Sequence, residues 1–309
     1  NFPIFITAVH MIMKFTISRI WSFSPSVEKI EPLPWSTFFT VVFPIGALTA
    51  ADIVLGNSSI LYLPLTTVTT IKGSSLIFTF FWGVVLGIED FRCQLLLAVT
   101  GITVGLGVAI TNSFSINLIG FSFAFGAALA SGLRWALMQL LVFRDNHSKS
   151  VMVTLYRFSP ASVFSILPFV FLLEAEKIAQ SSFLSKKQLF KDACLLCVFG
   201  GIIACLLIVV EVKLVRLTSS LTMSVFGQIK EIIQILCAMV LFKENLTSRG
   251  ALGICISIVS SFYYRYVLLN ATKDHSGGHG SPNNRNSPEI HRVFSHDRTG
   301  KKESERDAE

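Results

Sequence analysis

Two lysines lie where a membrane-spanning helix would carry them far from water. Lys230 lies about 17 Å into an apolar segment, at a rise of 1.5 Å per helical residue, which places it near the middle of a bilayer. Lys72 lies deep in an earlier segment, on a helix face that it shares with Thr69 and Ser75. A charge is costly there unless it is paired or faces water, so both lysines are candidates for function. An ammonium group among hydroxyls offers charge and hydrogen-bond donors, which indicates an anion-binding site.

The helix that carries Lys230 has one polar and one apolar face. At 100° per residue, the polar face spans about 140° and holds Ser219, Ser220, Ser224, Gly227, Lys230, Glu231 and Gln234. A continuous polar face that includes a glycine favours a water-filled cavity, and a static ion pair with a neighbouring helix is the alternative. The two helices together give the predicted substrate-binding residues Lys72, Lys230, Thr69, Ser75, Ser224 and Gln234.

Arg134 is a third cation deep in an apolar segment. Small residues on its helix face, such as Ser131, indicate close contact with another helix. The guanidinium group either pairs with a carboxylate, Asp52 or Glu211, or binds a substrate phosphate through its planar fork of donors. We include Arg134 among the predicted substrate-binding residues. The predicted counter-charges are Asp52, Glu211 and Glu231.

Lys14 is a cation of a different kind, because it lies towards the end of its apolar segment. A lysine in such a place can extend its long side chain to the lipid headgroups. We therefore expect Lys14 at the membrane interface. The same placement is the simpler interpretation of Arg157, Glu211 and Lys213, although Glu211 is also kept as a predicted counter-charge.

The segments of Lys72 and Lys230 end in a similar way. Leu86-Gly87-Ile88-Glu89 closes the first and Leu241-Phe242-Lys243-Glu244 closes the second, and a glycine-containing apolar segment follows each. This weak internal symmetry is typical of transporters built from duplicated halves, which place the substrate site at the interface of the repeats.

The elements that must position these residues are apolar helices. The chain has 309 residues, 52% hydrophobic and 15% charged, whereas soluble domains carry roughly 25% charge. Nine segments are near the roughly 20 residues that a helix needs to cross a bilayer: 2–21, 38–61, 65–87, 94–111, 118–143, 154–173, 193–215, 219–242 and 251–269. The sequence thus predicts an all-α, polytopic membrane helical bundle at 1–269 and a disordered tail at 270–309.

The net charge of +7 belongs to the apolar part of the chain, because the tail has seven Lys or Arg and seven Asp or Glu. Cationic loop ends are typical of polytopic membrane proteins, so we expect the lipid bilayer as a partner and no nucleic acid. The apolar segments contain no phosphate-binding Gly-x-x-x-x-Gly-Lys-Ser/Thr loop and no nucleophile–base constellation. We therefore predict that the protein is not an enzyme and uses no cofactor or metal.

Four motifs together resemble those of the nucleotide-sugar and triose-phosphate translocators of the drug/metabolite transporter superfamily. They are Asp52-Ile-Val-Leu-Gly-Asn-Ser-Ser-Ile-Leu-Tyr62, Thr70-Ile-Lys-Gly-Ser-Ser75, Gly132-Leu-Arg-Trp135 with Gln139, and Ser219-Ser-Leu-Thr-Met-Ser224 leading to Lys230-Glu231. Among these carriers the chain looks most like the orphan solute carriers grouped beside the GDP-fucose transporters.

The resemblance implies ten helices in two inverted five-helix repeats. The nine segments would then be the second to the tenth helix, with the first one missing upstream of Asn1. It also implies that cations on the fourth and ninth helices grip a substrate phosphate, where Lys72 and Lys230 match. Glu231 stands where the sugar-phosphate carriers usually have an arginine.

We predict a secondary antiporter of the Golgi or a neighbouring secretory membrane. It would exchange a nucleotide sugar or sugar phosphate, an anionic phosphorylated small molecule, for a nucleotide or phosphate by alternating access. The alternative is a membrane protein that no longer transports and regulates Golgi glycosylation by binding partners, which the Lys230-Glu231 pair favours. The sequence leaves a homodimer open.

Overall fold

The computed structural model describes residues 2–22, 33–63, 65–110, 117–144, 150–180, 187–227, 229–230, 233 and 248–276. Its labelled helices are α1 (Pro3–Ser22), α2 (Trp35–Thr37), η1 (Phe38–Val42), α3 (Phe43–Ser59), α4 (Leu65–Gly73), α5 (Ser75–Val85), α6 (Cys93–Ile110), α7 (Leu118–Arg144), α8 (Val151–Leu173), α9 (Ala175–Ala179), α10 (Lys187–Leu217) and α12 (Ser248–Ser276). Residues 220–227 are also helical. Within these ranges there is no strand, so the all-α prediction is confirmed.

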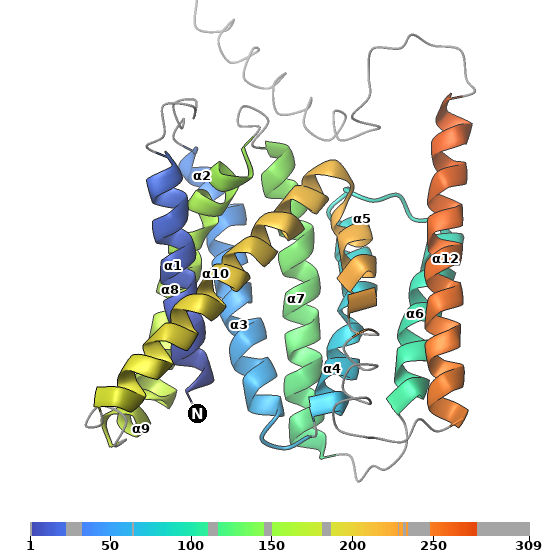
Figure 1. Ribbon diagram of the computed structural model, residues 1–309. Helices are drawn as coiled ribbons and strands as arrows, with labels where there is room; N and C mark the ends of the chain where they lie inside the picture. The colour runs from blue at the N-terminus through green and yellow to red at the C-terminus, as the bar shows by residue number, and fades with distance from the viewer. Residues whose placement is uncertain are drawn as a thin grey trace, which may run out of the picture.

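The long helices stand side by side around α7 (Figure 1). In this view α1, α3 and α8 lie on one side of α7, α6 and α12 lie on the other, and α10 crosses obliquely in front. The packed pairs include α3 with α7 and α8, α1 with α8 and α10, α5 with α7, and α6 with α12. The helices α1, α3, α7, α8 and α10 thus form the group that surrounds the cavity described below.

In the part of the chain that the structure describes, six helical stretches are long and apolar enough to cross a membrane, and each overlaps a predicted segment, with ends that differ by up to three residues. They are Pro3–Ser22, Trp35–Ser59, Thr67–Val85, Leu118–Val142, Val151–Leu173 and Ala193–Leu217. The apolar stretches Cys93–Gly105 and Ala251–Tyr264 are shorter. The chain is therefore a polytopic membrane protein, and the number of nine spans stays a prediction.

Two details differ from the sequence analysis, and one prediction lies outside the described residues. The segment 65–87 is interrupted at Ser74, which separates α4 from α5, and α12 continues past residue 269 to Ser276. The tail from residue 277 onwards lies outside the part of the chain that the structure describes.

Glycines set the distance between the helices that carry the candidate site. A Cβ atom at Gly46 of α3 would lie 2.5 Å from the backbone carbon of Ala161 in α8. A Cβ atom at Gly132 of α7 would lie 2.5 Å from the Cβ atom of Phe78 in α5. Both distances are far below van der Waals contact, so only glycine allows these helices to approach so closely.

The N-terminus of α1 is tied to the end of α8 by one carboxylate. Glu174 accepts hydrogen bonds from the backbone amides of Ile4 at 3.0 Å and Phe5 at 2.7 Å. Amides of a first helical turn have no partner inside the helix, and the positive end of the helix dipole favours an anion there. This contact fixes α1 against α8, the two helices that form one wall of the cavity.

A half-buried carboxylate, Glu89, lies in the link between α5 and α6, and its Oε1 atom is shielded from solvent. The link contains Gly87, whose φ of 66° suits glycine. The backbone amide of Ile88 donates to the carbonyl of Gly83 at 2.8 Å. The Glu89 side chain folds back over Gly83, where an added Cβ would lie 3.0 Å from its Cγ. Burial raises the pKa of Glu89 above its ordinary value of 4.5, and hydrogen bonds from Ser219 and Gln139 lower it in part.

We expect Glu89→Gln to raise the thermal stability at about pH 8 and to have no such effect at about pH 4. Because the pKa of Glu89 is raised in the folded state, the folded protein holds the proton of this carboxyl group more tightly than the unfolded chain does. The free energy of unfolding therefore falls as the pH rises from the ordinary carboxyl range through the raised pKa, and the glutamine removes this loss. Thermal unfolding in detergent between these pH values measures the effect.

Asp90→Asn is the matched control, because Asp90 is exposed and pairs with Arg92 at 3.8 Å. Like Glu89→Gln, this variant removes one negative charge, but it does so at an exposed position next to Glu89. Equal melting temperatures of Glu89→Gln and the unmodified protein at both pH values would contradict the prediction.

Candidate functional site

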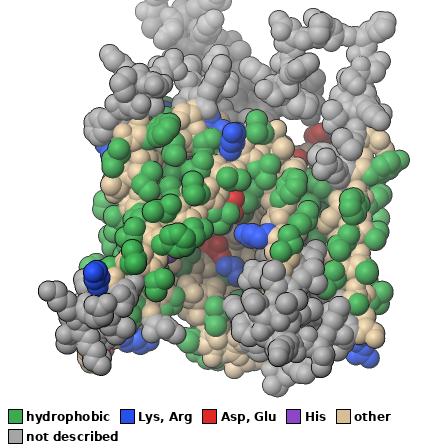
Figure 2. Space-filling view, viewed as in Figure 1, with side chains coloured by type: hydrophobic (Ala, Val, Ile, Leu, Met, Phe, Trp, Pro, Cys, Tyr) green, Lys and Arg blue, Asp and Glu red, His purple; other side chains and the backbone are tan. Residues whose placement is uncertain are grey.

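A cavity of about 210 Å³ lies among α1, α3, α7, α8 and α10. Its polar lining residues are Thr7, Lys14, Thr49, Asp52, Arg134, Ser159, Ser162 and Glu211. Its apolar lining residues are Met11, Ile53, Phe158, Ala204, Leu207 and Ile208. The space-filling view shows a hollow at the centre of an otherwise hydrophobic face, and charged side chains of both signs gather there (Figure 2).

Asp52 is the centre of the charge arrangement. Its Oδ1 atom lies 2.8 Å from Nζ of Lys72, and its Oδ2 atom lies 3.5 Å from Nη2 of Arg134. Asp52 is buried, with 8% of its surface exposed. One carboxylate on α3 therefore joins a cation on α4 to a cation on α7, and the sequence analysis had named all three residues.

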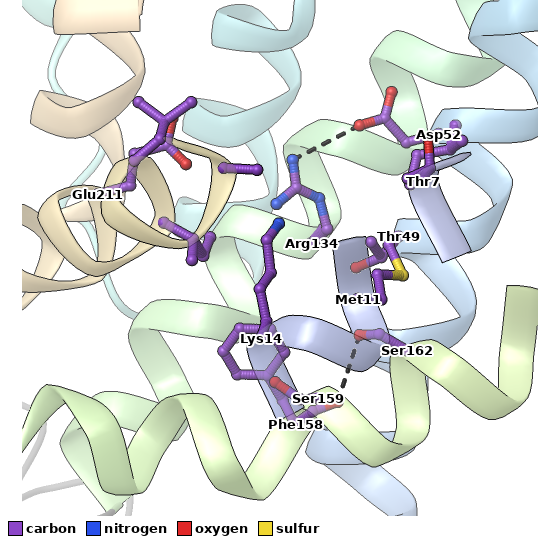
Figure 3. Close-up of a pocket in the computed structure, with 14 residues that line it drawn as sticks. Thr7, Met11, Lys14, Thr49, Asp52, Arg134, Phe158, Ser159, Ser162 and Glu211 are labelled. Atoms are coloured by element: carbon purple, nitrogen blue, oxygen red, sulfur yellow. Dashed lines mark hydrogen bonds and ion pairs between the residues drawn. The ribbon is translucent and has the colours of Figure 1, made fainter. Parts of the chain in front are cut away.

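Arg134 is held from two further directions. Its Nη2 atom donates a hydrogen bond to Oγ of Ser131 at 3.4 Å, and its Cζ atom lies 4.5 Å from the ring centre of Trp135. The guanidinium group lines the cavity in the close-up, with the dashed contact to Asp52 (Figure 3). Arg134 is thus paired with Asp52 and also faces the cavity. It can therefore link α7 to α3 and still be accessible to a ligand.

Glu211 and Lys230 form a looser pair on the opposite side. Nζ of Lys230 lies 3.8 Å from Oε1 of Glu211. The Lys230 side chain is 58% exposed, whereas the Glu211 side chain is 16% exposed. Glu211 lines the cavity. Lys230 is not among the lining residues and is linked to the cavity by its ion pair with Glu211.

Lys14 lies in the cavity and not at the membrane interface, so our expectation for it was wrong. Figure 3 shows its side chain directed from α1 towards Arg134. Thr7, Met11 and Lys14 all line the cavity. Their spacing places them on one helix face, and that face was the signal in the sequence that could have identified Lys14.

The predicted hydroxyl residues have other surroundings. Ser224 donates a hydrogen bond to Oγ1 of Thr79 at 3.3 Å, and both residues are buried between helices. Thr69 and Ser75 are half-buried and are not among the lining residues of the cavity. Glu231 and Gln234 lie outside the described residues.

A different set of hydroxyls faces the cavity, and the sequence analysis missed it. Thr49 donates to the carbonyl of Ile45 at 2.6 Å, and Ser159 donates to the carbonyl of Leu155 at 2.6 Å. Ser162 and Thr7 also donate to carbonyls of their own helices. Since each hydroxyl has one proton and uses it inside its helix, the oxygen that remains at the cavity is an acceptor.

Comparison with protein families gives one match that covers most of the chain. The model of the Triose-phosphate Transporter family matches residues 1–265.

Among curated proteins, three probable sugar phosphate/phosphate translocators of Arabidopsis thaliana are similar to this chain. The first is 25% identical over 86% of this chain and 66% of its own length. The second is 27% identical over 85% of this chain and 77% of its own length. The third is 28% identical over 85% of this chain and 76% of its own length. The chain thus spans about two thirds of the length of the first relative.

A solved crystal structure has the same fold. It matches with a TM-score of 0.61 at 16% sequence identity, over 86% of this chain and 89% of that chain.

Proposed function

This chain belongs to the triose-phosphate transporter family, and we propose that it exchanges a small sugar phosphate for phosphate across a membrane by alternating access. The family match confirms the resemblance found in the sequence. As a member of that family, the protein is a membrane transporter and not an enzyme. The names of the similar plant proteins support sugar phosphate and phosphate as the substrate class.

The observation that carries the proposal is the charge around the cavity. Among the described residues, the cations Lys14, Lys72, Arg134 and Lys230 outnumber the carboxylates Asp52 and Glu211 by two. A phosphate monoester carries a charge of about −1.5 to −2 near pH 7. A bound sugar phosphate would therefore bring the site close to neutrality, with the phosphate at the cations.

The hydroxyl oxygens of Thr7, Thr49, Ser159 and Ser162 suit the rest of such a substrate. They are acceptors at the cavity, because their protons are used inside the helices. Sugar hydroxyls can donate to them. The cavity thus combines cations for a phosphate with acceptors for a sugar.

The size of the cavity favours the smaller of the two predicted substrate classes. Its volume of about 210 Å³ is below the roughly 300–1,000 Å³ of pockets for drug-sized ligands. A nucleotide sugar is a ligand of that larger size. We therefore place a sugar phosphate before a nucleotide sugar, which stays the other predicted class.

The same charge balance supports exchange over one-way transport. An empty cavity that closes must remove an excess of positive charge from water, whereas a loaded cavity closes nearly neutral. The carrier would then change sides with an anion bound, which is antiport. The Golgi or a neighbouring secretory membrane stays our proposal for the location, and the resemblance of the sequence alone supports it.

Thermal stabilisation of the purified protein tests the proposal against the non-transporting alternative. We expect one of inorganic phosphate, triose phosphates and hexose phosphates to raise the melting temperature, because a ligand at 100 times its Kd stabilises a protein by about 2.7 kcal/mol. Nucleotide sugars in the same panel report on the larger substrate class. A protein that acts only by binding partners would ignore every member of the panel, and exchange in proteoliposomes would then be absent as well.

A further inference from the structure

We infer that Asp52 is an internal competitor of the substrate: its carboxylate lies between Lys72 and Arg134, in the place where the anionic group of the substrate binds. The inference rests on the proposed function and goes beyond it, since it gives a buried acidic residue a part in setting the affinity for an anion. Asp52 is the shared partner of both cations, at 2.8 Å and 3.5 Å.

The chemistry of the two donors supports this competition. Ammonium and guanidinium groups bind a carboxylate and a phosphate through the same charge-assisted hydrogen bonds. Asp52 uses both of its oxygens, one for each cation. A phosphate that binds Lys72 and Arg134 must therefore take over the contacts that Asp52 makes with them.

The local backbone brings Lys72 to Asp52. A Cβ atom at Gly56 would lie 3.0 Å from Nζ of Lys72, so the ammonium group rests against α3 at a position without a side chain. Asp52 lies one helical turn before Gly56 on the same helix. The glycine leaves a path on the surface of α3 along which the Lys72 side chain reaches the carboxylate.

The other cations allow a substrate to arrive before Asp52 gives way. The side chain of Lys230 is 58% exposed and its distance to Glu211 is 3.8 Å, longer than the Lys72–Asp52 contact. Lys14 also lines the cavity. These two cations can attract an anion into the cavity, and the half-buried cations Lys72 and Arg134 become available when Asp52 is displaced.

The alternative role for Asp52 is to hold Lys72 and Arg134 in position for the substrate. The two roles predict opposite effects of Asp52→Asn, which keeps the shape of the side chain and removes its charge. Competition predicts tighter binding of inorganic phosphate, with Kd and the KM of phosphate exchange lowered about tenfold by the loss of one nearby negative charge. Positioning predicts weaker binding.

The experiment compares purified Asp52→Asn with the unmodified carrier. Phosphate titrations followed by thermal unfolding give the Kd, and exchange in proteoliposomes gives the KM. Glu176→Gln is the matched control, because Glu176 lies outside the cavity on the short helix α9 and is exposed; it should change neither value. A Kd that is unchanged or raised in Asp52→Asn overturns the inference.

A second comparison covers the case in which Asp52→Asn does not fold. Lys72→Ala leaves Arg134 as the remaining cation within ion-pair distance of Asp52 among the described residues. The double variant Lys72→Ala/Asp52→Asn has the same net charge as the unmodified protein and frees Arg134. We expect it to bind phosphate several-fold more tightly than Lys72→Ala alone, and equal or weaker binding overturns the inference.

The outcomes separate the inference from the proposed function. An unmodified carrier that neither binds nor exchanges phosphate or any sugar phosphate overturns the proposed function, and the inference fails with it. An unmodified carrier that exchanges phosphate, combined with weaker binding in Asp52→Asn, overturns the inference alone.

Discussion

We expect Lys230→Ala to lower phosphate exchange in proteoliposomes by about 100-fold, since a hydrogen bond to a charged group contributes up to about 3 kcal/mol and each 1.4 kcal/mol is a factor of ten. The substitution also leaves Glu211 at the cavity without its lysine partner. Among the described charges around the cavity, the excess of two positive charges then falls to one, and the Glu211 carboxylate, without its partner, repels a phosphate.

The fold should survive this substitution, because the Lys230 side chain is 58% exposed. The melting temperature without ligand is the measurement that shows this. Lys213→Ala is the matched control: Lys213 is an exposed lysine of α10 outside the cavity lining, and its removal should leave exchange unchanged. Normal uptake by Lys230→Ala would remove Lys230 from the site without any consequence for the fold.

The charged centre of the site was predictable because its residues break an apolar pattern. Asp52, Arg134 and Glu211 lie in apolar segments, where an unpaired charge is energetically unfavourable. Such residues can be identified as candidates from the sequence alone. Their pairing was less visible. The sequence offered both Asp52 and Glu211 as partners for Arg134, and the packing of α3 against α7 decides for Asp52.

The hydroxyl residues show where periodicity stops being sufficient. Ser224 was predicted to bind substrate from the polar face of its helix, and the structure places it instead against Thr79 of α5. A helical projection does not tell whether two polar faces meet each other or a cavity, and here the two hydroxyls meet each other. The interruption of the helix at Ser74 adds to this, because a projection at 100° per residue assumes one continuous helix.

Lys14 shows the converse limitation. Its place towards the end of an apolar segment indicated an interfacial lysine, but depth along a helix and direction around it are separate properties. The direction is shared with Thr7 and Met11, and the packing of α1 against α8 and α10 turns that face inwards. The six described helical stretches that are long and apolar enough to cross a membrane each overlap a predicted segment, since length and hydropathy depend on local sequence alone.

Arg134→Ala should reduce exchange as strongly as Lys230→Ala while lowering stability only modestly. Breaking a buried ion pair usually costs about 3–5 kcal/mol because one charge stays uncompensated. Here Asp52 keeps its 2.8 Å contact with Lys72. The folded protein then loses mainly the contact with the Trp135 ring, which contributes about 0.5–2 kcal/mol.

This difference decides between the two roles that the sequence left open for Arg134. A residue that only clamps α7 to α3 would lower the melting temperature strongly and leave the KM of the remaining folded carrier unchanged. A residue that binds phosphate would raise the KM by about 100-fold with a small loss of stability. Arg134→Lys keeps the charge but loses the planar fork, so exchange should recover only in part. We expect the second pattern, because the guanidinium group lines the cavity beside Lys14.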